Sequence, residues 1–168
     1  MKAQDIRKIA VAGAGTMGAS MAQIFAKYGY TVVLYDIAEA ALERGRNLVK
    51  VNQESQIAAG DLTAEQSAEV VSRLHFTLDK QCFADCDLVV ESVLENLEIK
   101  QNFWEEVSRI ARPDCLLSSE VSRYARVLYL TYYILFGIDA RTEQDTPVDF
   151  MRDLSFYFAQ NEEDRKYM

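Results

Sequence analysis

The stretch that decides the fold is residues 9–36, which read IAVAGAGTMGASMAQIFAKYGYTVVLYD. An apolar run of residues 9–12 stops at Gly13, and apolar residues at helical spacing begin just past Gly18 and end near Gly29. Residues 31–35 are rich in β-branched and aromatic side chains and are followed by Asp36, which is typical of a strand. The stretch therefore predicts a strand, a tight turn, a helix and a second, parallel strand.

The turn has the spacing G-x-G-x-x-G between a strand and a helix, which is typical of a loop that binds the pyrophosphate of a dinucleotide. The first glycine permits the turn, the second lets the backbone approach the pyrophosphate, and the third allows close packing of helix on strand. Free N–H groups at the start of the helix would hold the anion. A glycine turn without a ligand is the alternative, which this context disfavours. The predicted site consists of Gly13, Ala14, Gly15, Thr16, Met17 and Gly18.

Asp36 ends the second predicted strand, eighteen residues past Gly18. A carboxylate at this place can accept hydrogen bonds from a ribose 2′-hydroxyl and repels a 2′-phosphate. No arginine follows Asp36 directly. The predicted cofactor is therefore NAD rather than NADP.

The chain beyond Asp36 continues the alternation of helices and strands. Glu39 begins a long helical stretch that Gly60 ends, and Thr63 with Gln66 has the pattern of a capping box, so residues 39–73 predict a helical hairpin. The further predicted elements are strands at 74–78, 88–90 and 115–118, and a helix at 97–111 with Ile99, Phe103, Val107 and Ile110 on its apolar face. This order predicts an α/β fold with a doubly wound, mainly parallel sheet.

Composition limits the function. The 168 residues include 26 acidic and 18 basic side chains, a formal net charge of -8, so we expect no nucleic acid as a partner. The longest strongly apolar run, residues 127–136, is about half of the ~20 residues needed to cross a bilayer, and we expect no membrane anchor. The first residues have no signal-peptide pattern, which predicts a cytoplasmic location.

The cysteines and the single histidine do not form a metal-binding pattern. Cys82, Cys86 and Cys115 contain no Cys-x-x-Cys pair, and His75 is not spaced to join them in a zinc site. We therefore expect reduced thiols that act as small buried hydrophobic residues, and no metal. His75 lies before or within the third predicted strand, which favours a structural role.

Composition changes after Ser119, which predicts two units, a dinucleotide-binding domain at 1–119 and an aromatic-rich, mainly helical tail at 120–168. The tail holds six of the nine tyrosines and four of the eight phenylalanines. Residues 124–136 are apolar nearly all round, and Thr146 can cap a final amphipathic helix. The tail covers the sheet edge and exposed core, or it forms a surface for a partner protein or a second copy of the chain.

Residues 6–119 resemble the NAD-binding domain of the 3-hydroxyacyl-CoA dehydrogenases, including the bacterial 3-hydroxybutyryl-CoA dehydrogenases. The resemblance rests on the glycine loop, on GDLTAEQ at residues 60–66 and above all on DCDLVVESVLENLEIKQNFW at residues 85–104. It implies a Rossmann-type fold, with the pyrophosphate on the glycine loop and the adenine ribose on Asp36. It also implies that Glu95 and Lys100 lie near the nicotinamide half of NAD and that the backbone of Ser92 borders the cofactor.

The resemblance fails after the fifth predicted strand. Where the family has Asn-Thr-Ser, this chain has Glu120, Val121 and Ser122, so Ser122 alone is a candidate substrate or cofactor serine. The family's catalytic histidine, the glutamate that pairs with it and its C-terminal helical domain have no counterpart here, and no catalytic residue is assigned. Hydride transfer needs a general base, so we expect the chain alone to be inactive or weakly active.

Three hypotheses follow. The first is the NAD-binding part of a 3-hydroxyacyl-CoA dehydrogenase-like oxidoreductase of fatty-acid or butyrate metabolism, with an acyl-CoA as candidate substrate and another subunit as a candidate source of the histidine. The second is a non-catalytic NAD sensor or interaction protein that uses the aromatic tail as a partner surface. The third is that the residues beyond Ser119 were joined to the rest by rearrangement, splicing or engineering.

Overall fold

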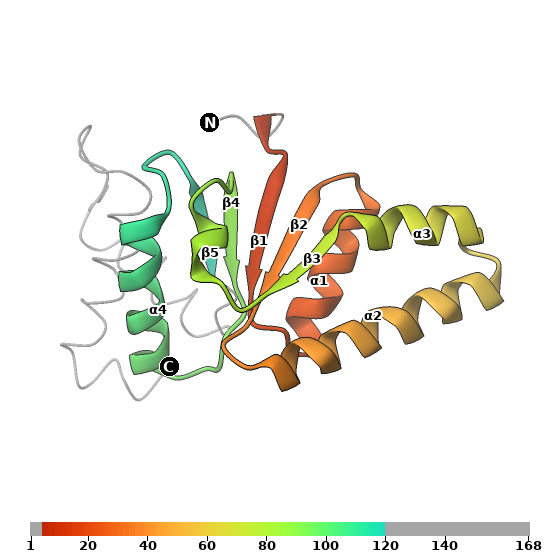
Figure 1. The fold of residues 1–168 in the computed structure, drawn as a ribbon, viewed down its shortest axis with the longest axis horizontal. Helices are drawn as coiled ribbons and strands as arrows, with labels where there is room; N and C mark the ends of the chain where they lie inside the picture. Colours follow the sequence, from red (N-terminus) through yellow and green to blue (C-terminus); the bar gives the residue numbers. More distant parts are fainter. Residues whose placement is uncertain (1–4, 120–168) are drawn as a thin grey trace, which may run out of the picture.

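The computed structural model describes residues 5–119, which form a five-stranded sheet with helices on both faces (Figure 1). All strands are parallel, in the order β3-β2-β1-β4-β5. The strands are β1 (Lys8–Ala12), β2 (Thr31–Tyr35), β3 (Leu74–Thr77), β4 (Leu88–Glu91) and β5 (Leu116–Ser119). The helices are α1 (Thr16–Lys27), α2 (Glu39–Ala59), α3 (Ala64–Ser72), the short 3-10 helix η2 (Lys80–Phe83) and α4 (Leu97–Ile110). The predicted doubly wound α/β fold is confirmed.

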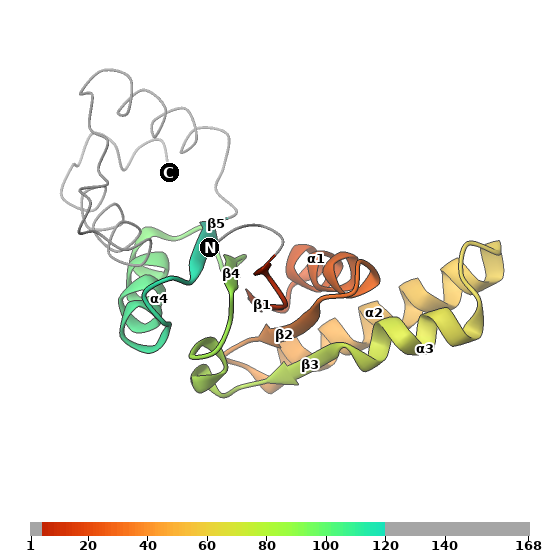
Figure 2. The same ribbon diagram turned by 90° about the horizontal axis from the view of Figure 1, so that it is seen from above.

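Alternation along the central strands builds a core on each face of the sheet, because successive side chains of a strand point to opposite faces. Ile9 and Val11 of β1 pack with the buried side of α1, α2 and α3. Ala10 and Ala12 face the other core, which contains Phe83 of η2 and the aromatic residues of α4. Figure 2 shows α1 to α3 on one side of the sheet and α4 on the other.

The predicted hairpin at residues 39–73 is confirmed as α2 and α3, which extend together away from the sheet (Figures 1 and 2). Gly60 follows α2 in the left-handed conformation, φ 80° and ψ 10°, which is favourable for glycine. Thr63 and Gln66 form the predicted capping box, with both reciprocal hydrogen bonds present.

Several boundaries differ from the prediction. Helix α1 begins at Thr16, before the apolar periodic residues past Gly18, because its first residues, Thr16 and Met17, are exposed and lie off the buried face of the helix. Strand β4 includes Glu91, and β5 begins at Leu116 rather than at Cys115. Strand β3 ends at Thr77, and η2 was not predicted.

The predicted apolar face of α4 is partly wrong. Ile99 is 39% exposed, whereas Trp104 is 3% exposed. The buried positions are Lys100, Phe103, Trp104 and Val107, which follow the spacing i, i+3, i+4, i+7. A lysine therefore lies on the stripe of α4 that faces the protein interior.

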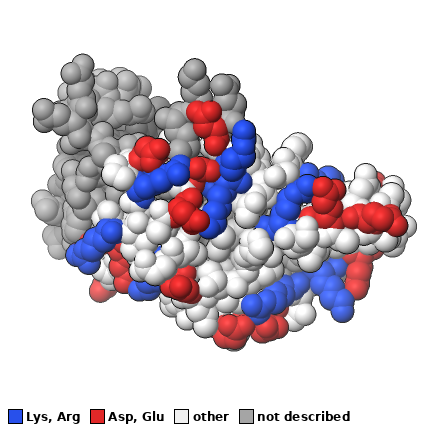
Figure 3. Space-filling model, turned by 45° about the horizontal axis from the view of Figure 1, so that its top comes forward, with Lys and Arg blue, Asp and Glu red and all other residues white. Residues whose placement is uncertain are grey.

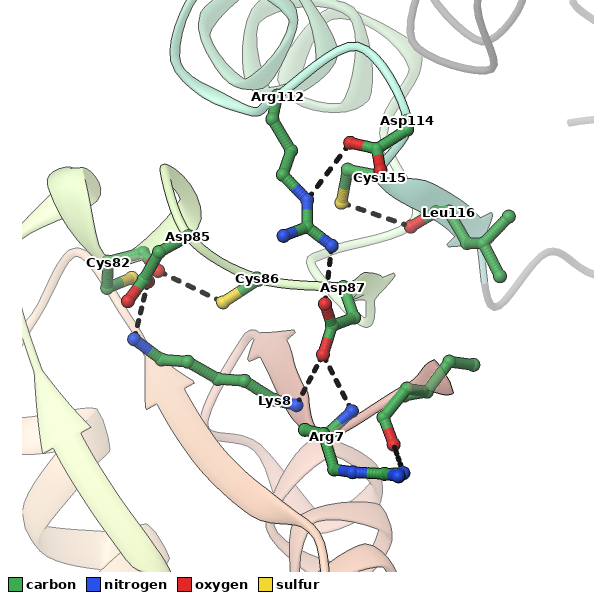
Figure 4. Close-up of polar contacts among 11 residues, drawn as sticks. Arg7, Lys8, Cys82, Asp85, Cys86, Asp87, Arg112, Asp114, Cys115 and Leu116 are labelled. Atoms are coloured by element: carbon green, nitrogen blue, oxygen red, sulfur yellow. Dashed lines mark hydrogen bonds and ion pairs between the residues drawn. The ribbon is translucent and has the colours of Figure 1, made fainter. Parts of the chain in front are cut away.

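The amino ends of the central strands are joined through Asp87, just before β4 (Figure 4). Its Oδ2 accepts hydrogen bonds from the backbone N–H groups of Arg7 at 2.6 Å and Lys8 at 2.8 Å. Its Oδ1 pairs with the guanidinium of Arg112, which lies between α4 and β5. Asp87 thus connects the start of β1 with the segment that leads into β5.

Ion pairs are distributed over the surface of the described part of the chain. Arg46 pairs with Glu39 and Glu43 on α2, and Arg73 pairs with Glu69 on α3. On the face shown in Figure 3, basic side chains lie beside acidic ones. Among the described residues, no helix is both long and apolar enough for a bilayer span.

The sequence-based predictions for residues 120–168 lie outside the described residues. They include the candidate serine Ser122, the tail domain and its helices at 124–136 and from Thr146 onward.

Candidate NAD-binding site

The glycine loop at residues 13–18 joins β1 to α1 and depends on glycine at two contacts. Gly13 has φ +106°, and a Cβ there would lie 2.2 Å from the carbonyl oxygen of Ser92. A Cβ on Gly18 would lie 1.8 Å from the carbonyl oxygen of Gly13. The loop therefore packs directly against the segment that follows β4, with no room for a methyl group at either position.

The second glycine of the loop faces open space instead. Apart from its chain neighbours, a Cβ on Gly15 would meet no atom of residues 5–119 within 4 Å, and Gly15, Thr16 and Met17 are all exposed. Helix α1 begins here without a side-chain cap and without an acidic residue in its first turn. Its first N–H groups and the positive end of its dipole therefore suit a diphosphate, and the space above Gly15 fits the approach of one.

Asp36 follows β2 and is tied to the glycine loop. Its Oδ2 accepts a hydrogen bond from the N–H of Ala14 at 2.8 Å, and its Oδ1 accepts one from the N–H of Ala38 at 3.0 Å. The carboxylate is half-buried, and each oxygen has a second lone pair for a ribose hydroxyl. The residues directly after it, Ile37 and Ala38, offer no positive charge to a 2′-phosphate.

A buried charge cluster lies at the carboxyl ends of β4 and β5. Glu91 is fully buried, and the Nζ of Lys100 lies 3.0 Å from its Oε1 and 2.9 Å from its Oε2. The N–H of Val93 donates to Oε1 at 2.8 Å, and the hydroxyl of Ser119 donates to Oε2. The Nζ of Lys100 also lies 3.4 Å from Glu95, whose side chain is 41% exposed. The cluster thus reaches from the interior to the surface of the loop after β4.

The structure places the predicted cofactor residues in two adjacent groups. The glycine loop and Asp36 form one group, and Lys100 and Glu95 belong to the buried charge cluster. Ser92 connects the two, because its carbonyl oxygen lies against Gly13 and its N–H donates to Ala12 at 2.8 Å. These assignments remain predictions of cofactor contact.

Sequence reasoning missed Glu91 and Ser119 as site residues. Glu91 ends an apolar strand, where an acid is easily interpreted as the first residue of a solvent-exposed loop. The signal that could have found it is Lys100, which shares the apolar stripe of α4 with Phe103 and Val107. A lysine in a buried position requires an acidic partner.

His75 lies away from this group of residues. It is the second residue of the edge strand β3, is exposed, and pairs in register with Val33 of β2. The binding groups described above lie instead at the carboxyl ends of β1, β2 and β4. Within residues 5–119, His75 is the only histidine.

The cysteines lie near the opposite end of the sheet. Cys86 and Cys115 are buried and Cys82 is half-buried, all as free thiols (Figure 4). Burial raises the pKa of Cys82 and of Cys86 to about 12 and that of Cys115 to about 11. Such thiols are poor nucleophiles. No group of three or more metal-ligating side chains was found among the described residues.

One family model covers both the fold and its glycine loop. The model of the NAD-binding domain of 3-hydroxyacyl-CoA dehydrogenase matches residues 8–126. The chain belongs to this family. Its described residues are therefore an NAD-binding domain of the 3-hydroxyacyl-CoA dehydrogenase type, as the resemblance predicted.

Individual proteins similar to this chain belong to the same kind of enzyme. A probable 3-hydroxybutyryl-CoA dehydrogenase of Deinococcus radiodurans is 39% identical over 115 residues, which are 68% of this chain and 41% of the relative. The structure of FadB2 of Mycobacterium tuberculosis has a TM-score of 0.68 and 33% identity, over 70% of this chain and 41% of FadB2. The 3-hydroxybutyryl-CoA dehydrogenase of Escherichia coli K12 has a TM-score of 0.67 and 35% identity, over 70% of this chain and 25% of that one. The chain thus spans less than half the length of these relatives.

Proposed function

We propose that this chain holds NAD(H) for hydride exchange with a 3-hydroxyacyl-CoA in fatty-acid or butyrate metabolism. The observation that carries the proposal is the glycine loop, which offers an uncapped helix start and open space above Gly15 beside the carboxylate of Asp36. Membership of the family supports the class of substrate. NAD, when bound, would accept the hydride from the hydroxyl-bearing carbon of the acyl chain.

The binding residues have separate tasks in this proposal. The N–H groups of the first turn of α1 bind the pyrophosphate, and Asp36 accepts from the adenine ribose and excludes NADP. Ala14 and Ala38 hold the Asp36 carboxylate from two sides, so it is oriented before the cofactor arrives.

The proton of the substrate hydroxyl needs a base, for which histidine is well suited near neutral pH. His75 lies on β3, at the edge of the sheet farthest from β5, and is not placed for this task. We propose that the base comes from outside residues 5–119, from a further segment or another subunit. Residues 5–119 then bind and orient the cofactor and do not take the substrate proton.

Calorimetric titration of the full chain with NADH and NADPH tests the binding step. We expect micromolar NADH binding, at least tenfold weaker binding of NADPH, and a loss of NADH affinity in Asp36→Ala. Gly15→Ala is the matched loop variant, because its Cβ meets no atom of the described residues beyond its chain neighbours, so the fold should be kept while NADH binding weakens. A folded chain that binds no NADH would refute the proposal.

The catalytic step is tested by NADH oxidation with acetoacetyl-CoA. The chain alone should turn over slowly, and addition of a protein that supplies the missing base should raise the rate. Rapid oxidation by the chain alone would show that the base lies within it.

A further inference from the structure

Glu91 is a fully buried carboxylate with no assigned role, and each of its oxygens has two partners. Oε1 faces Lys100 and the N–H of Val93, and Oε2 faces Lys100 and the hydroxyl of Ser119. These groups come from α4, from the loop after β4 and from the end of β5. One side chain thus connects three elements at the carboxyl edge of the sheet.

The position of Glu91 relates it to one half of the cofactor. Strand order reverses between β1 and β4, and a dinucleotide binds across the crevice at such a point. The pyrophosphate site lies after β1 and the ribose-binding Asp36 lies after β2. The adenosine half therefore occupies the β2 side, and the nicotinamide half extends toward the loops after β4 and β5. Glu91 lies beneath these loops.

Glu91 also makes a hydrogen bond to the backbone of the loop after β4. Its Oε1 accepts from the N–H of Val93, two residues on, at 2.8 Å, which ties the backbone just after β4 to the Glu91 side chain. The carbonyl oxygen of Ser92 then lies in the space that a side chain on Gly13 would need. We propose that Glu91 is a positioning residue that, together with Lys100 and Ser119, sets residues 92–96 for the nicotinamide half of NAD.

A purely structural role is a weaker explanation of this arrangement. A buried ion pair adds little net stability compared with apolar side chains of similar volume. Its geometry is however strict, since every donor and acceptor must be matched. The effect of the cluster is therefore expected in the placement of the loop and of Glu95 at its surface, beyond any effect on stability.

The inference rests on the proposed NAD binding, and the test separates the two by comparing NADH with ADP. ADP contains the adenosine and pyrophosphate portions and lacks the nicotinamide riboside. In calorimetric titrations of the full chain, Glu91→Gln should weaken NADH binding about tenfold, which corresponds to the loss of one charge-assisted contact. The same variant should weaken ADP binding less than twofold. The double variant Glu91→Gln with Lys100→Met removes both charges and should show the same selective loss in a stable fold.

Asp87→Asn is the matched control, because it changes an acid at the other end of β4. It should leave the ratio of NADH to ADP affinity unchanged. Equal weakening of both ligands in the Glu91 variants, or no weakening of either, would overturn the positioning role. Failure of the unmodified chain to bind either ligand would instead refute the proposed function.

Discussion

Asp87 and Glu91 lie at opposite ends of β4 and use a carboxylate in similar ways, yet their surroundings differ. Each accepts backbone hydrogen bonds and pairs with one basic side chain. The side chain of Arg112, the partner of Asp87, is 36% exposed, whereas that of Lys100, the partner of Glu91, is 5% exposed. Asp87, at the amino end, joins the start of β1 to Arg112 near the protein surface. The carboxyl-end acid forms a buried ion pair with Lys100 beneath the loop that follows β4.

The largest expected effect follows from removing Glu91. Glu91→Ala leaves Lys100 buried without its main acidic partner, which costs about 3–5 kcal/mol of unfolding free energy. Urea denaturation followed by circular dichroism measures the loss. A loss below 1 kcal/mol would mean that the pair is not sealed from water.

The double variant Glu91→Gln with Lys100→Met is the control for this prediction. It removes both charges, so it should recover most of the stability that Glu91→Ala loses. If it is as unstable as Glu91→Ala, lost packing rather than an unpaired charge explains the effect.

Removing the charge of Asp87, at the amino end of β4, should lower the unfolding free energy by less than Glu91→Ala does. Asp87→Asn weakens charge-assisted hydrogen bonds to two backbone N–H groups and to Arg112, an expected loss of about 2 kcal/mol at pH 7. The control is Asp114→Asn, because Asp114 also pairs with Arg112 but is 64% exposed. Asp114→Asn should lower the unfolding free energy by less than about 0.5 kcal/mol in the same denaturation experiment.

The difference between the unmodified chain and Asp87→Asn should depend on pH. Burial alone raises the pKa of Asp87, but the N–H groups of Lys8 and Arg7 and the guanidinium of Arg112 outweigh it and lower that pKa. A lowered folded-state pKa stabilises the protein fully above the unfolded value of about 4. This stabilisation disappears as the pH falls through the folded-state pKa. Denaturation midpoints across this range measure the change, and an unchanged difference at low pH would contradict it.

The three cysteine thiols report on the structure near the amino ends of β4 and β5. Their raised pKa values and burial predict very slow alkylation by iodoacetamide at pH 8 in the folded chain. Asp87→Asn should accelerate labelling of Cys86 and Cys115, since it loosens the segments around them. Mass spectrometry of the labelled peptides measures this, and rapid labelling of the unmodified chain would refute their burial.

The smallest expected effect is at the surface of the carboxyl-end cluster. Glu95→Gln changes an exposed carboxylate 3.4 Å from Lys100, so the unfolding free energy should change by less than about 0.5 kcal/mol. A loss comparable to that of Glu91→Ala would mean that the two acids share the charge of Lys100 equally. Thermal denaturation of both variants distinguishes these outcomes.

The sequence was sufficient for the features that depend on local physics. The glycine loop, the apolar strands and the capping box of Thr63 with Gln66 follow from residue type and spacing alone. The apolar periodicity does not mark the start of α1, because the first residues of the helix, Thr16 and the exposed Met17, lie off its buried face.

Lys100 on the apolar stripe of α4 indicates a buried acidic partner, but sequence spacing does not identify which residues form the buried charge cluster, because its contacts join distant positions. Ser119 is twenty-eight residues from Glu91, and the register of β4 with β5 brings the two together. Lys100 is nine residues from Glu91 and reaches it because α4 packs on this face of the sheet. The exposure of Ile99 has a similar cause, since α4 packs on the sheet through Phe103, Trp104 and Val107 and leaves Ile99 at the edge of the buried face.

The contact between Gly13 and Ser92 has a mechanical consequence. Two loops that follow different strands lie so close together that a Cβ on Gly13 would be 2.2 Å from the carbonyl oxygen of Ser92, so neither loop can move closer to the other. In the proposed binding mode, the two halves of the cofactor meet a frame whose spacing is set during folding. Little binding energy is then spent on rearranging the protein, and a strained residue at position 13 would disturb both halves at once.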